Sequence, residues 1–417
     1  MKKRLVLLMT IVTAVAFAQA PPNAAGPGAG REPGVGFSNP TLHSPEVSSD
    51  RRVTFRLLAP NATAVFVRGI MRQPLPMQKD SAGLWTATTE PMKPDLYSYT
   101  FVVDGLSIID PANTRLRPSY HRLGQSSVQV PGDNAWTPLP DAPRGAVSHH
   151  VYHSALAMDE RDFYVYTPPG YDPKRRQPYP VLYLLHGLGD EANAWTDVGA
   201  ANVILDTLIY QRKAQPMILV NPLGYGNADG PNGHRREDML PTFVRILIEE
   251  IMPQVERQYN ASTNRTDHAV AGLSMGGAEA TLAGLNHLDK FAWIGSFSGA
   301  YNLWPLTRPA EQRETAGEVA PGPTPTPGRG AGPGRLVLEE SQLPKTFPGL
   351  DAKSNAQIKL IWLACGTADG LIGVNRQFKV YLDSKGVKVA FTEVPDQGHV
   401  WPLWRQNLAE FAPQLFK

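Results

Sequence analysis

The segment with the clearest chemical potential is residues 269–278, in which Ser274 stands between Gly272 and Gly276. An apolar run enters this segment, and a helix-forming stretch, residues 278–287, follows it. Gly-x-Ser-x-Gly in the order strand, tight turn, helix exposes a serine hydroxyl above a parallel sheet. A side chain at either glycine would collide with the neighbouring strand or helix. The pattern predicts a nucleophilic Ser274; the alternative is an ordinary turn serine.

A serine hydroxyl is a weak nucleophile at neutral pH and needs a histidine as its general base. In this arrangement the acid and the histidine follow the serine along the chain, and only His287 and His399 do so here. His287 falls on the helix after the serine, where a packing or surface role is expected. His399 falls in the loop between the last predicted strand and the last predicted helix, so the pattern favours His399 as the base.

Two aspartates are candidates for the acid that orients this histidine. Asp369 follows a predicted strand, residues 358–364, within the sequence Cys-Gly-Thr-Ala-Asp-Gly. A carboxylate at that position can fix the histidine tautomer and stabilise the imidazolium. Asp396 is the competitor because it stands only three residues before His399, although a turn role suits it better. The pattern favours Asp369.

Acyl transfer also needs hydrogen-bond donors for the oxyanion of its tetrahedral intermediate. One predicted donor is the backbone N–H of Met275, directly after the serine. The second is expected in the turn after the apolar run that ends at His186 and Gly187, where the N–H of Leu188 is the best candidate. His186 itself is interpreted as a structural residue and not as a base.

The elements around these residues alternate between strand and helix. The continuous apolar run at 180–185 suits a strand buried on both faces, and residues 242–259 have the spacing of a long amphipathic helix. Further strands are predicted at 161–166, 217–220, 268–271, 291–297, 358–364 and 387–394, and further helices at 203–211, 371–385 and 400–416. This alternation predicts a doubly wound, mostly parallel sheet over residues 147–417.

The N-terminal part has another pattern. Residues 41–132 contain short β-prone runs separated by Pro and Gly, which predict a small immunoglobulin-like β-sandwich. Trp85, Tyr97 and Tyr99 could stack on sugar rings, but filling the core or a domain interface is the favoured interpretation. Residues 133–146 are interpreted as a Pro-rich linker to the α/β part.

The composition limits the possible functions and locations. The chain has 417 residues, a net charge of +2 and 42% hydrophobic residues, which argues against global disorder and against nucleic-acid binding by bulk charge. Residues 1–20 read as a cleavable signal peptide, with a basic start, an apolar run and a small-x-small end. An uncleaved anchor is the alternative, although the run is short for a span. We expect a secreted or periplasmic protein.

The chain also contains two low-complexity segments and one cysteine. Residues 21–40 are interpreted as a flexible linker, and residues 315–335, rich in Pro and Gly, as a mobile surface loop. Cys365 is the single cysteine, so no internal disulfide can form, and the apolar run before it predicts a buried thiol.

Three histidines, at 149, 150 and 153, lie close together in the sequence. No carboxylate or cysteine set completes a recognisable ligand pattern around them. They are interpreted as a solvated face of the linker, and no metal and no other cofactor is expected.

Together the motifs resemble carbohydrate esterase family 1, the feruloyl and acetylxylan esterase group, which is also called esterase D-like or enterochelin-esterase-like. The resemblance covers about residues 147–417. It rests on Tyr166-Thr-Pro-Pro-Gly-Tyr171, Tyr179-Pro-Val-Leu-Tyr-Leu-Leu-His-Gly187, Trp195, Gly272-Leu-Ser-Met-Gly-Gly277, Cys365-Gly-Thr-Ala-Asp369 and Gly398-His399. It implies an α/β hydrolase with Ser274, Asp369 and His399 as a catalytic triad and Leu188 and Met275 as oxyanion donors.

Residues 96–105, with the Asp-Pro-Ala-Asn at 110–113, resemble the early-set domain that is often classed as a family-48 carbohydrate-binding module. With the triad, this resemblance implies a secreted serine esterase that releases hydroxycinnamoyl groups such as ferulate from plant polysaccharides such as arabinoxylan. An acetylxylan esterase, a siderophore (enterochelin-type) esterase, and an acyltransferase or non-catalytic glycan-binding protein remain alternatives. Trp195, Trp304 and Trp401 are candidates for the acyl pocket, although each could instead be a core residue.

Overall fold

The computed structural model of the protein describes residues 42–71, 73–117, 124–226, 239–307 and 338–417. The predicted signal peptide (1–20), the first linker (21–40) and the Pro/Gly-rich loop (315–335) lie outside the described residues. The chain divides into two units, Met1–Thr41 and Leu42–Lys417, and the described residues all belong to the second. None of its described helices has both the length and the apolar character to cross a membrane.

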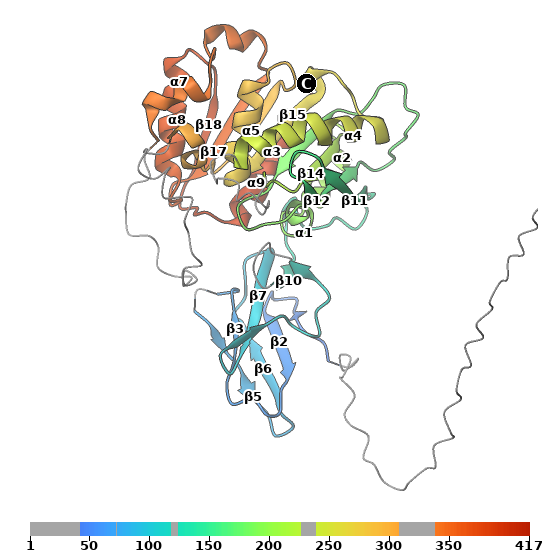
Figure 1. Ribbon diagram of the computed structural model, residues 1–417. Coiled ribbons are helices and arrows are strands. Elements are labelled where there is room, and N and C mark those ends of the chain that lie inside the picture. The colour runs from blue at the N-terminus through green and yellow to red at the C-terminus, as the bar shows by residue number, and fades with distance from the viewer. Residues whose placement is uncertain (1–41, 72, 118–123, 227–238, 308–337) are drawn as a thin grey trace, which may run out of the picture. The chain divides into compact units, whose positions relative to one another are not determined.

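The first part of this unit consists of two antiparallel sheets, called here the sandwich. One has the strand order β1-β2-β6-β5, and the other has the order β4-β3-β7-β10-β9, with β8 paired to β7 (Figure 1). The strands are β1 (Glu46–Val47), β2 (Val53–Leu58), β3 (Val65–Arg68), β4 (Leu75–Pro76), β5 (Gln78–Lys79), β6 (Leu84–Thr88), β7 (Asp95–Val103), β8 (Leu106–Ile108), β9 (Leu116–Arg117) and β10 (Gln125–Val130). Two packed antiparallel sheets agree with the predicted sandwich, whereas its early-set assignment stays a prediction.

Aromatic side chains fill the core of the sandwich. Phe55 and Tyr99 meet edge to face with ring centroids 4.7 Å apart, and Trp85 is 6% exposed. The Tyr99 hydroxyl donates to Asp110 Oδ2 at 2.7 Å and accepts from Asn113 Nδ2 at 3.1 Å. The core interpretation of Trp85 and Tyr99 is therefore confirmed, and Asp110 and Asn113 of the Asp-Pro-Ala-Asn motif bind a buried hydroxyl.

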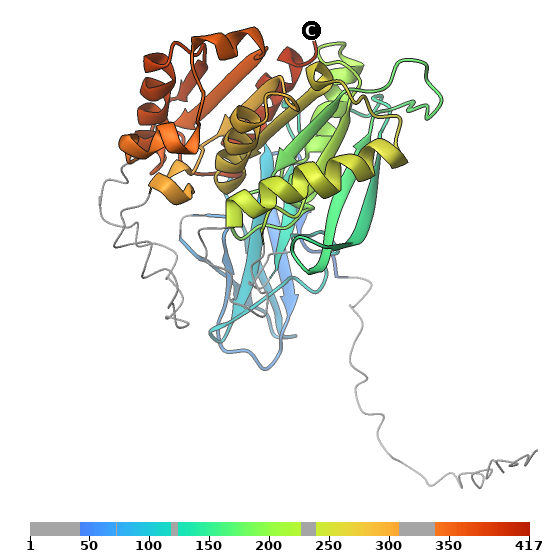
Figure 2. The same ribbon diagram turned by 45° about the horizontal axis from the view of Figure 1, so that its top comes forward.

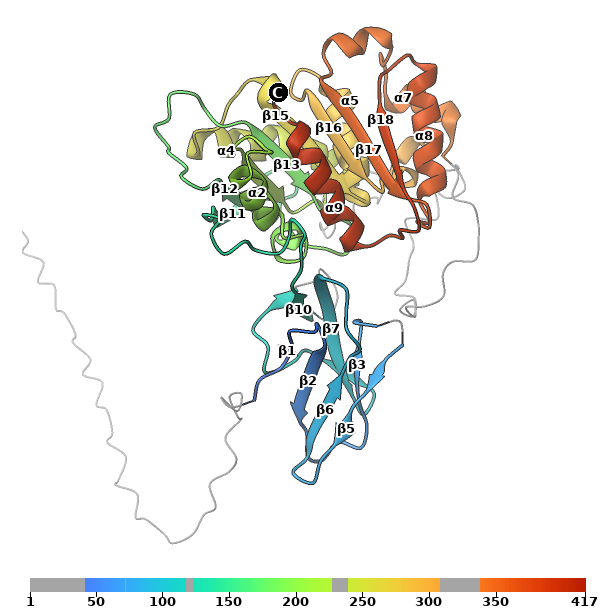
Figure 3. The same cartoon turned by 180° about the vertical axis from the view of Figure 1, so that it is seen from behind.

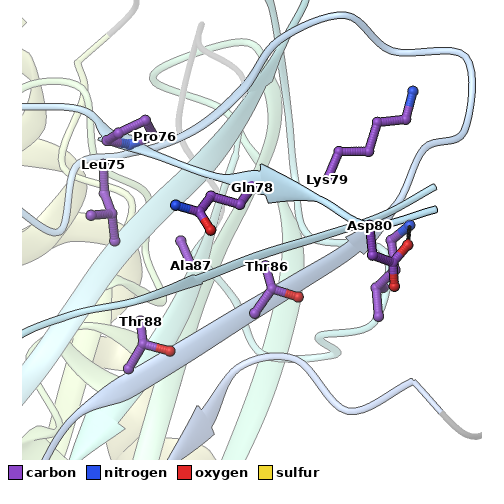
Figure 4. Close-up of a pocket in the computed structure, with 9 residues that line it drawn as sticks. Leu75, Pro76, Gln78, Lys79, Asp80, Thr86, Ala87 and Thr88 are labelled. Carbon is purple, nitrogen blue, oxygen red and sulfur yellow. Dashed lines mark hydrogen bonds between the residues drawn. The ribbon is translucent and has the colours of Figure 1, made fainter. Parts of the chain in front are cut away.

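A surface hollow of about 510 Å³ lies on the sandwich between strands β4, β5 and β6 (Figure 4). Leu75, Gln78, Lys79, Thr86 and Thr88 are among the residues that line it. These side chains are aliphatic or polar, and no aromatic ring is among the lining residues. The hollow therefore lacks the flat aromatic surface on which sugar rings usually stack.

The described residues of the second part form an eight-stranded sheet with the order β11-β12-β14-β13-β15-β16-β17-β18. The pairs β11–β12 and β12–β14 are antiparallel, and every other pair is parallel. The strands are β11 (Ala146–Ser154), β12 (Asp159–Thr167), β13 (Val181–Leu185), β14 (Ile218–Pro222), β15 (His268–Leu273), β16 (Trp293–Phe297), β17 (Leu360–Gly366) and β18 (Ala390–Val394). The predicted mostly parallel sheet is confirmed.

Helices cover both faces of this sheet. Figures 1 and 3, seen from opposite sides, show α2 and α9 on one face, and Figure 2 shows the α3–α4 segment crossing the strands on the other. The α-helices are α1 (Ala194–Asp197), α2 (Ala201–Tyr210), α3 (Met239–Ile246), α4 (Met252–Gln258), α5 (Met275–Asn286), α7 (Leu343–Thr346), α8 (Ile372–Ser384) and α9 (Trp401–Phe411). The shorter elements are the π-helical η2 (Leu247–Ile251) and the 3₁₀ turns η3 (Arg265–Asp267), η4 (Tyr301–Leu303), η5 (Pro305–Thr307), η7 (Glu340–Gln342), η8 (Ala352–Ala356) and η9 (Ala412–Gln414).

Strand β13 shows why a continuous apolar run was required. Val181, Tyr183 and Leu185 pack into a core with residues of α3, α4, α5 and α8. Leu182 and Leu184 point the other way, into a core with residues of α2 and α9. Because side chains alternate across a strand, a strand covered by helices on both faces must be apolar at every position.

Two elements differ from the sequence-based expectation. The end of the predicted linker and the three histidines belong to β11, an edge strand whose residues are mostly exposed, so the alternation that marks a half-buried strand is missing. The predicted helix at 242–259 contains the π-helical turn η2 directly before α4. Pro253 lies in the first turn of α4, and because proline has no N–H to donate to the preceding turn, a wider turn can accommodate it.

Candidate active site

Ser274 lies on the sharp turn between β15 and α5. Its backbone has φ 53° and ψ −115°, a strained conformation for a residue with a side chain. A Cβ built on Gly276 would lie 2.5 Å from the carbonyl oxygens of Leu185 and His186, and one on Gly272 would collide with Gly276 O. Both contacts are impossibly short, so the predicted reason for the two glycines is confirmed.

The structure brings Ser274, His399 and Asp369 together. His399 Nε2 lies 3.0 Å from Ser274 Oγ, and His399 Nδ1 lies 2.8 Å from Asp369 Oδ2. The Asp369 side chain is 1% exposed, whereas the His399 side chain is 37% exposed. Burial alone would raise the pKa of Asp369, but the hydrogen bond and charge of His399 and the N–H of Leu371 together lower it, so this carboxyl is held ionised beside the imidazole.

The loops that carry the acid and the histidine are hydrogen-bonded to each other. Ala368 N donates to Gln397 O at 3.0 Å, and Asp396 N donates to Thr367 Oγ1 at 2.9 Å. Asp396 itself is exposed and has φ 58°, as expected of a turn residue. The geometry therefore separates the two candidate acids: Asp369 contacts the imidazole, and Asp396 forms the turn before it.

The predicted oxyanion donors belong to two segments near the serine, since a Cβ built on Gly187, next to Leu188, would lie 3.5 Å from Ser274 Cβ. Met275 is the first residue of α5, and the first N–H groups of a helix have no acceptor within that helix. Leu188 lies in a four-residue turn, residues 187–190, closed by Asp190 N donating to Gly187 O at 3.1 Å. Gly189 in this oxyanion turn has φ +89°, a conformation that favours glycine.

His186 is 1% exposed and behind the oxyanion turn. Its Nε2 accepts from Gly224 N at 2.8 Å, so its Nδ1 carries the proton and donates to Gly187 O at 2.8 Å. Burial lowers the pKa of His186. The imidazole is therefore a neutral structural group that spaces two backbone segments, as predicted.

A buried carboxyl that the sequence analysis did not single out lies nearby. Glu279, on α5, is 0% exposed, and neither carboxyl oxygen has a hydrogen-bond partner among the described residues. A Cβ built on Gly224 would lie 3.2 Å from Glu279 Oε2 and 3.3 Å from His186 Nε2. Burial raises the pKa of Glu279 well above its ordinary value, with Arg161 opposing the shift. No local motif could have marked this glutamate.

The three tryptophans predicted as pocket candidates differ in placement. Trp195 and Trp304 are 0% exposed, and their indole N–H groups donate to Leu185 O and Ala278 O. This is a correction: both are core residues that no acyl group could contact in this structure, because amphipathic indoles are readily buried when the N–H finds an acceptor. Trp401 is 8% exposed and follows the histidine loop, residues 395–400, so it stays a candidate.

Trp404 was missed by the sequence analysis. Its ring lies edge to face with His399 at 4.8 Å between centroids, and its Nε1 donates to Ser298 Oγ at 3.2 Å. Ser298 also contributes to the lowered pKa of Asp369. Trp404 therefore packs against the imidazole and binds a neighbour of the acid. The sequence feature that could have marked Trp404 as a site residue is its position in the first turns of the helix predicted after His399.

The remaining candidates are structural. Cys365 is 0% exposed, as predicted for a core thiol, and His287 lies at the C-terminal end of α5, at the other end from the serine. His149 Nε2 lies 2.8 Å from Asp162 Oδ2, and His150 Nε2 lies 2.6 Å from the Tyr259 hydroxyl. Within the described ranges, no group of three His, Cys, Asp or Glu side chains could hold a metal ion.

Known proteins resemble this chain in sequence and fold. Residues 154–334 match the family model described as Esterase, putative esterase. The Endo-1,4-beta-xylanase/feruloyl esterase of Xylanibacter ruminicola is 27% identical over 389 residues, which are 91% of this chain and 47% of that protein. The chain thus spans less than half the length of this relative.

Two solved structures share the fold. The ferulic acid esterase from Anaeromyces mucronatus has a TM-score of 0.52 at 24% identity, over 68% of this chain and 96% of that chain. The enterobactin esterase from Shigella flexneri has a TM-score of 0.57 at 19% identity, over 88% of this chain and 92% of that chain. The 88% is too large a share to come from the α/β part alone, so this match includes residues of the sandwich. Residues 154–334, which include Ser274, are therefore similar to the esterase family that this model describes, and Asp369 and His399 lie beyond the matched residues.

Proposed function

We propose that this protein is an exported serine carboxylesterase that hydrolyses hydroxycinnamoyl esters, such as feruloyl groups, on plant polysaccharides such as arabinoxylan. The observation that carries the hydrolase part is the hydrogen-bonded series from Ser274 Oγ to His399 to Asp369, at 3.0 and 2.8 Å. These distances are those expected of a nucleophile, its general base and the group that orients the base.

In the first half-reaction Ser274 Oγ attacks the ester carbonyl carbon, and His399 Nε2 accepts the hydroxyl proton. Asp369 accepts a hydrogen bond from His399 Nδ1–H, so Nε2 is free of a proton before attack and the imidazolium is stabilised after it. The N–H groups of Met275 and Leu188 donate to the oxyanion, where the loss of one donor costs roughly 10²–10³ in rate. His399 then protonates the leaving sugar oxygen, and the acyl group stays on Ser274.

In the second half-reaction a water molecule takes the place of the sugar. His399 removes a proton from the water as it attacks the acyl carbon, and the same donors stabilise the second oxyanion. Protonation of Ser274 Oγ by His399 releases the free acid. The exposed edge of His399, 37% of its side chain, leaves the reacting atoms open to water and to an acyl group carried on a long polymer.

The substrate class is supported by the relative from Xylanibacter ruminicola, whose name combines xylanase and feruloyl esterase. The predicted signal peptide supports export, since polymeric substrates of this size stay outside the cell. An acetylated xylan is the near variant, because the same chemistry removes a smaller acyl group.

A second candidate is hydrolysis of a siderophore ester. It is favoured by the likeness to the enterobactin esterase from Shigella flexneri, which extends over 88% of this chain. The predicted export of the protein argues against it, because siderophore ester hydrolysis usually follows uptake into the cytoplasm.

A substrate panel on the purified protein tests both candidates. We expect turnover of p-nitrophenyl acetate, methyl ferulate and feruloylated arabinoxylan oligosaccharides, with the oligosaccharide preferred over a catecholate triester. Ser274→Ala should abolish turnover of all of them, and a full-activity Ser274→Ala variant would overturn the hydrolase assignment. A wild-type protein that cleaves p-nitrophenyl acetate and the triester but not the feruloyl substrates would overturn the substrate class alone.

A further inference from the structure

Arg117 belongs to the sandwich, yet its side chain contacts two segments beside the triad. Its Nη2 donates to Asp190 Oδ1 at 2.6 Å, and its guanidinium carbon lies 6.0 Å from the centre of the Trp401 ring. Asp190 closes the oxyanion turn, and Trp401 begins α9 two residues after His399. A single cation from β9 therefore contacts both the turn that carries Leu188 and the helix that follows the general base.

The Asp190 carboxylate and the Ser274 side chain both lie beside Gly187. A Cβ built on Gly187 would lie 3.6 Å from Asp190 Oδ2 and 3.5 Å from Ser274 Cβ, so the two side chains flank the same glycine. The Asp190 side chain is 9% exposed and that of Arg117 is 23% exposed. A carboxylate buried to this extent is costly without a partner, so loss of Arg117 would drive Asp190 to turn toward water and deform the oxyanion turn.

A second contact from the sandwich binds the helix after the histidine. Arg405, in α9, is 0% exposed. Its Nη2 donates to Asp95 Oδ1 at 2.5 Å and to Leu96 O at 3.2 Å, and both acceptors belong to β7. Its Nη1 donates to Val198 O at 2.5 Å. A buried side chain of α9, the helix that begins two residues after His399, is thus hydrogen-bonded to a strand of the sandwich.

We propose that the sandwich is a structural part of the active site, and that Arg117 is a positioning residue that keeps the oxyanion turn and α9 in their catalytic arrangement. The inference rests on the esterase activity proposed for the same site. It predicts that the sandwich affects the hydrolysis of every ester, including esters that carry no sugar. A sandwich that served only to bind glycan would affect polymeric substrates alone.

The experiment compares Arg117→Ala, Arg117→Lys and wild-type full-length protein on p-nitrophenyl acetate and methyl ferulate, neither of which carries a sugar. We expect Arg117→Ala to lower kcat about tenfold on both esters, a fraction of the roughly 10²–10³ lost with a whole oxyanion donor, while KM changes less than twofold. Affinity for a boronic acid that mimics the tetrahedral intermediate should fall by the same factor as kcat. Arg117→Lys keeps the charge and should recover at least half of the lost activity.

The matched control is Arg56→Ala. Arg56 also lies in the sandwich and forms an ion pair, from its Nη2 to Glu46 Oε2 at 2.8 Å. Here, however, both residues belong to the sandwich: Glu46 lies on β1 and Arg56 on β2. This variant should keep wild-type kcat on both esters. Thermal unfolding of each variant shows whether a lower kcat reflects lost fold; if Arg117→Ala unfolds, Arg117→Lys and Asp190→Asn carry the same test.

The double variant Arg117→Ala/Asp190→Asn distinguishes positioning from general damage. Because the neutral amide no longer needs a cation, the double variant should be more active than Arg117→Ala alone. Unchanged kcat in Arg117→Ala, a loss seen only on feruloylated arabinoxylan, or losses that multiply in the double variant would each overturn the proposal. A wild-type protein that cleaves p-nitrophenyl acetate but not methyl ferulate would instead refute the feruloyl substrate class, and the comparison on p-nitrophenyl acetate would still decide the role of Arg117.

Discussion

Replacing Asp369 by asparagine should remove most of the activity while leaving the fold intact. The two hydrogen bonds of this carboxyl explain why. Asp369 Oδ1 accepts from Leu371 N at 2.8 Å, and Asp369 Oδ2 faces His399 Nδ1 at 2.8 Å. The oxygen of an asparagine must take the position beside the Leu371 N–H, since only an acceptor fits there. Its NH₂ group then faces His399 Nδ1 as a donor.

This reversal fixes the wrong tautomer of the base. With a donor at Nδ1, His399 must accept there and carry its proton on Nε2, the atom 3.0 Å from Ser274 Oγ. A protonated Nε2 cannot take the serine proton. We therefore expect Asp369→Asn to lower kcat about 10⁴-fold, equivalent to about 5 kcal/mol of transition-state stabilisation.

The assay is kcat on methyl ferulate near neutral pH, with Asp396→Asn as the matched control. Asp396 is exposed, with φ 58°, and asparagine tolerates that backbone conformation well. Asp396→Asn should keep kcat within twofold of wild type. A loss of less than tenfold in Asp369→Asn, or equal losses in the two variants, would refute the assignment of Asp369 as the orienting acid.

Three further outcomes follow from buried groups. Burial raises the pKa of Glu279 well above its ordinary value, so the native state keeps this proton at pH values where the unfolded state has lost it. The free energy of unfolding should therefore fall as pH rises beyond the ordinary glutamate range. Glu279→Gln should flatten that fall in urea titrations from pH 5 to 9, and parallel curves for the variant and wild type would contradict it. Burial raises the pKa of Cys365 to about 12, so the thiol of the native protein should not react with a disulfide reagent at pH 8. The thiol of the urea-unfolded protein should react, and rapid labelling of the native protein would contradict this prediction. Asp95→Ala leaves Arg405 buried without its carboxylate and should lower the free energy of unfolding by about 3 kcal/mol. The double variant Asp95→Ala/Arg405→Met should regain part of this free energy. An equal loss in the single and the double variant would show that the buried charge is not the cause.

The triad could be predicted from sequence because each of its members follows a strand in the parallel part of one sheet. Carboxyl ends of parallel strands meet at one edge, so a serine after β15, an acid after β17 and a histidine after β18 must come together. The glycines at 272 and 276 carry further information, since the backbone of Gly276 excludes a side chain at 272, and the end of β13 with His186 excludes one at 276. Local pattern and topology point to the same residues.

Other features left no local mark. Strand β11 is an exposed edge, so its residues face water on most positions and show neither alternation nor a continuous apolar run. Tryptophan side chains suit both a pocket and a core, and only the packing around Trp195 and Trp304 decides between them. Arg117 and Asp190 are 73 residues apart in sequence, and Arg405 and Asp95 are 310 apart. No spacing rule connects such pairs.

The difference between these two classes of residue has a mechanistic meaning. The position of Ser274 is set by close backbone contacts among β15, α5 and the end of β13. The oxyanion turn and α9 are instead in contact with side chains from β9 and β7. The proposed role of Arg117 predicts that substitutions in the sandwich shift Leu188 and His399 relative to a fixed serine, without altering the nucleophile. If the sandwich has this role, selectivity among acyl groups can change through residues that never contact the substrate, and a sugar-binding face on the sandwich is not needed to explain why it is joined to the esterase.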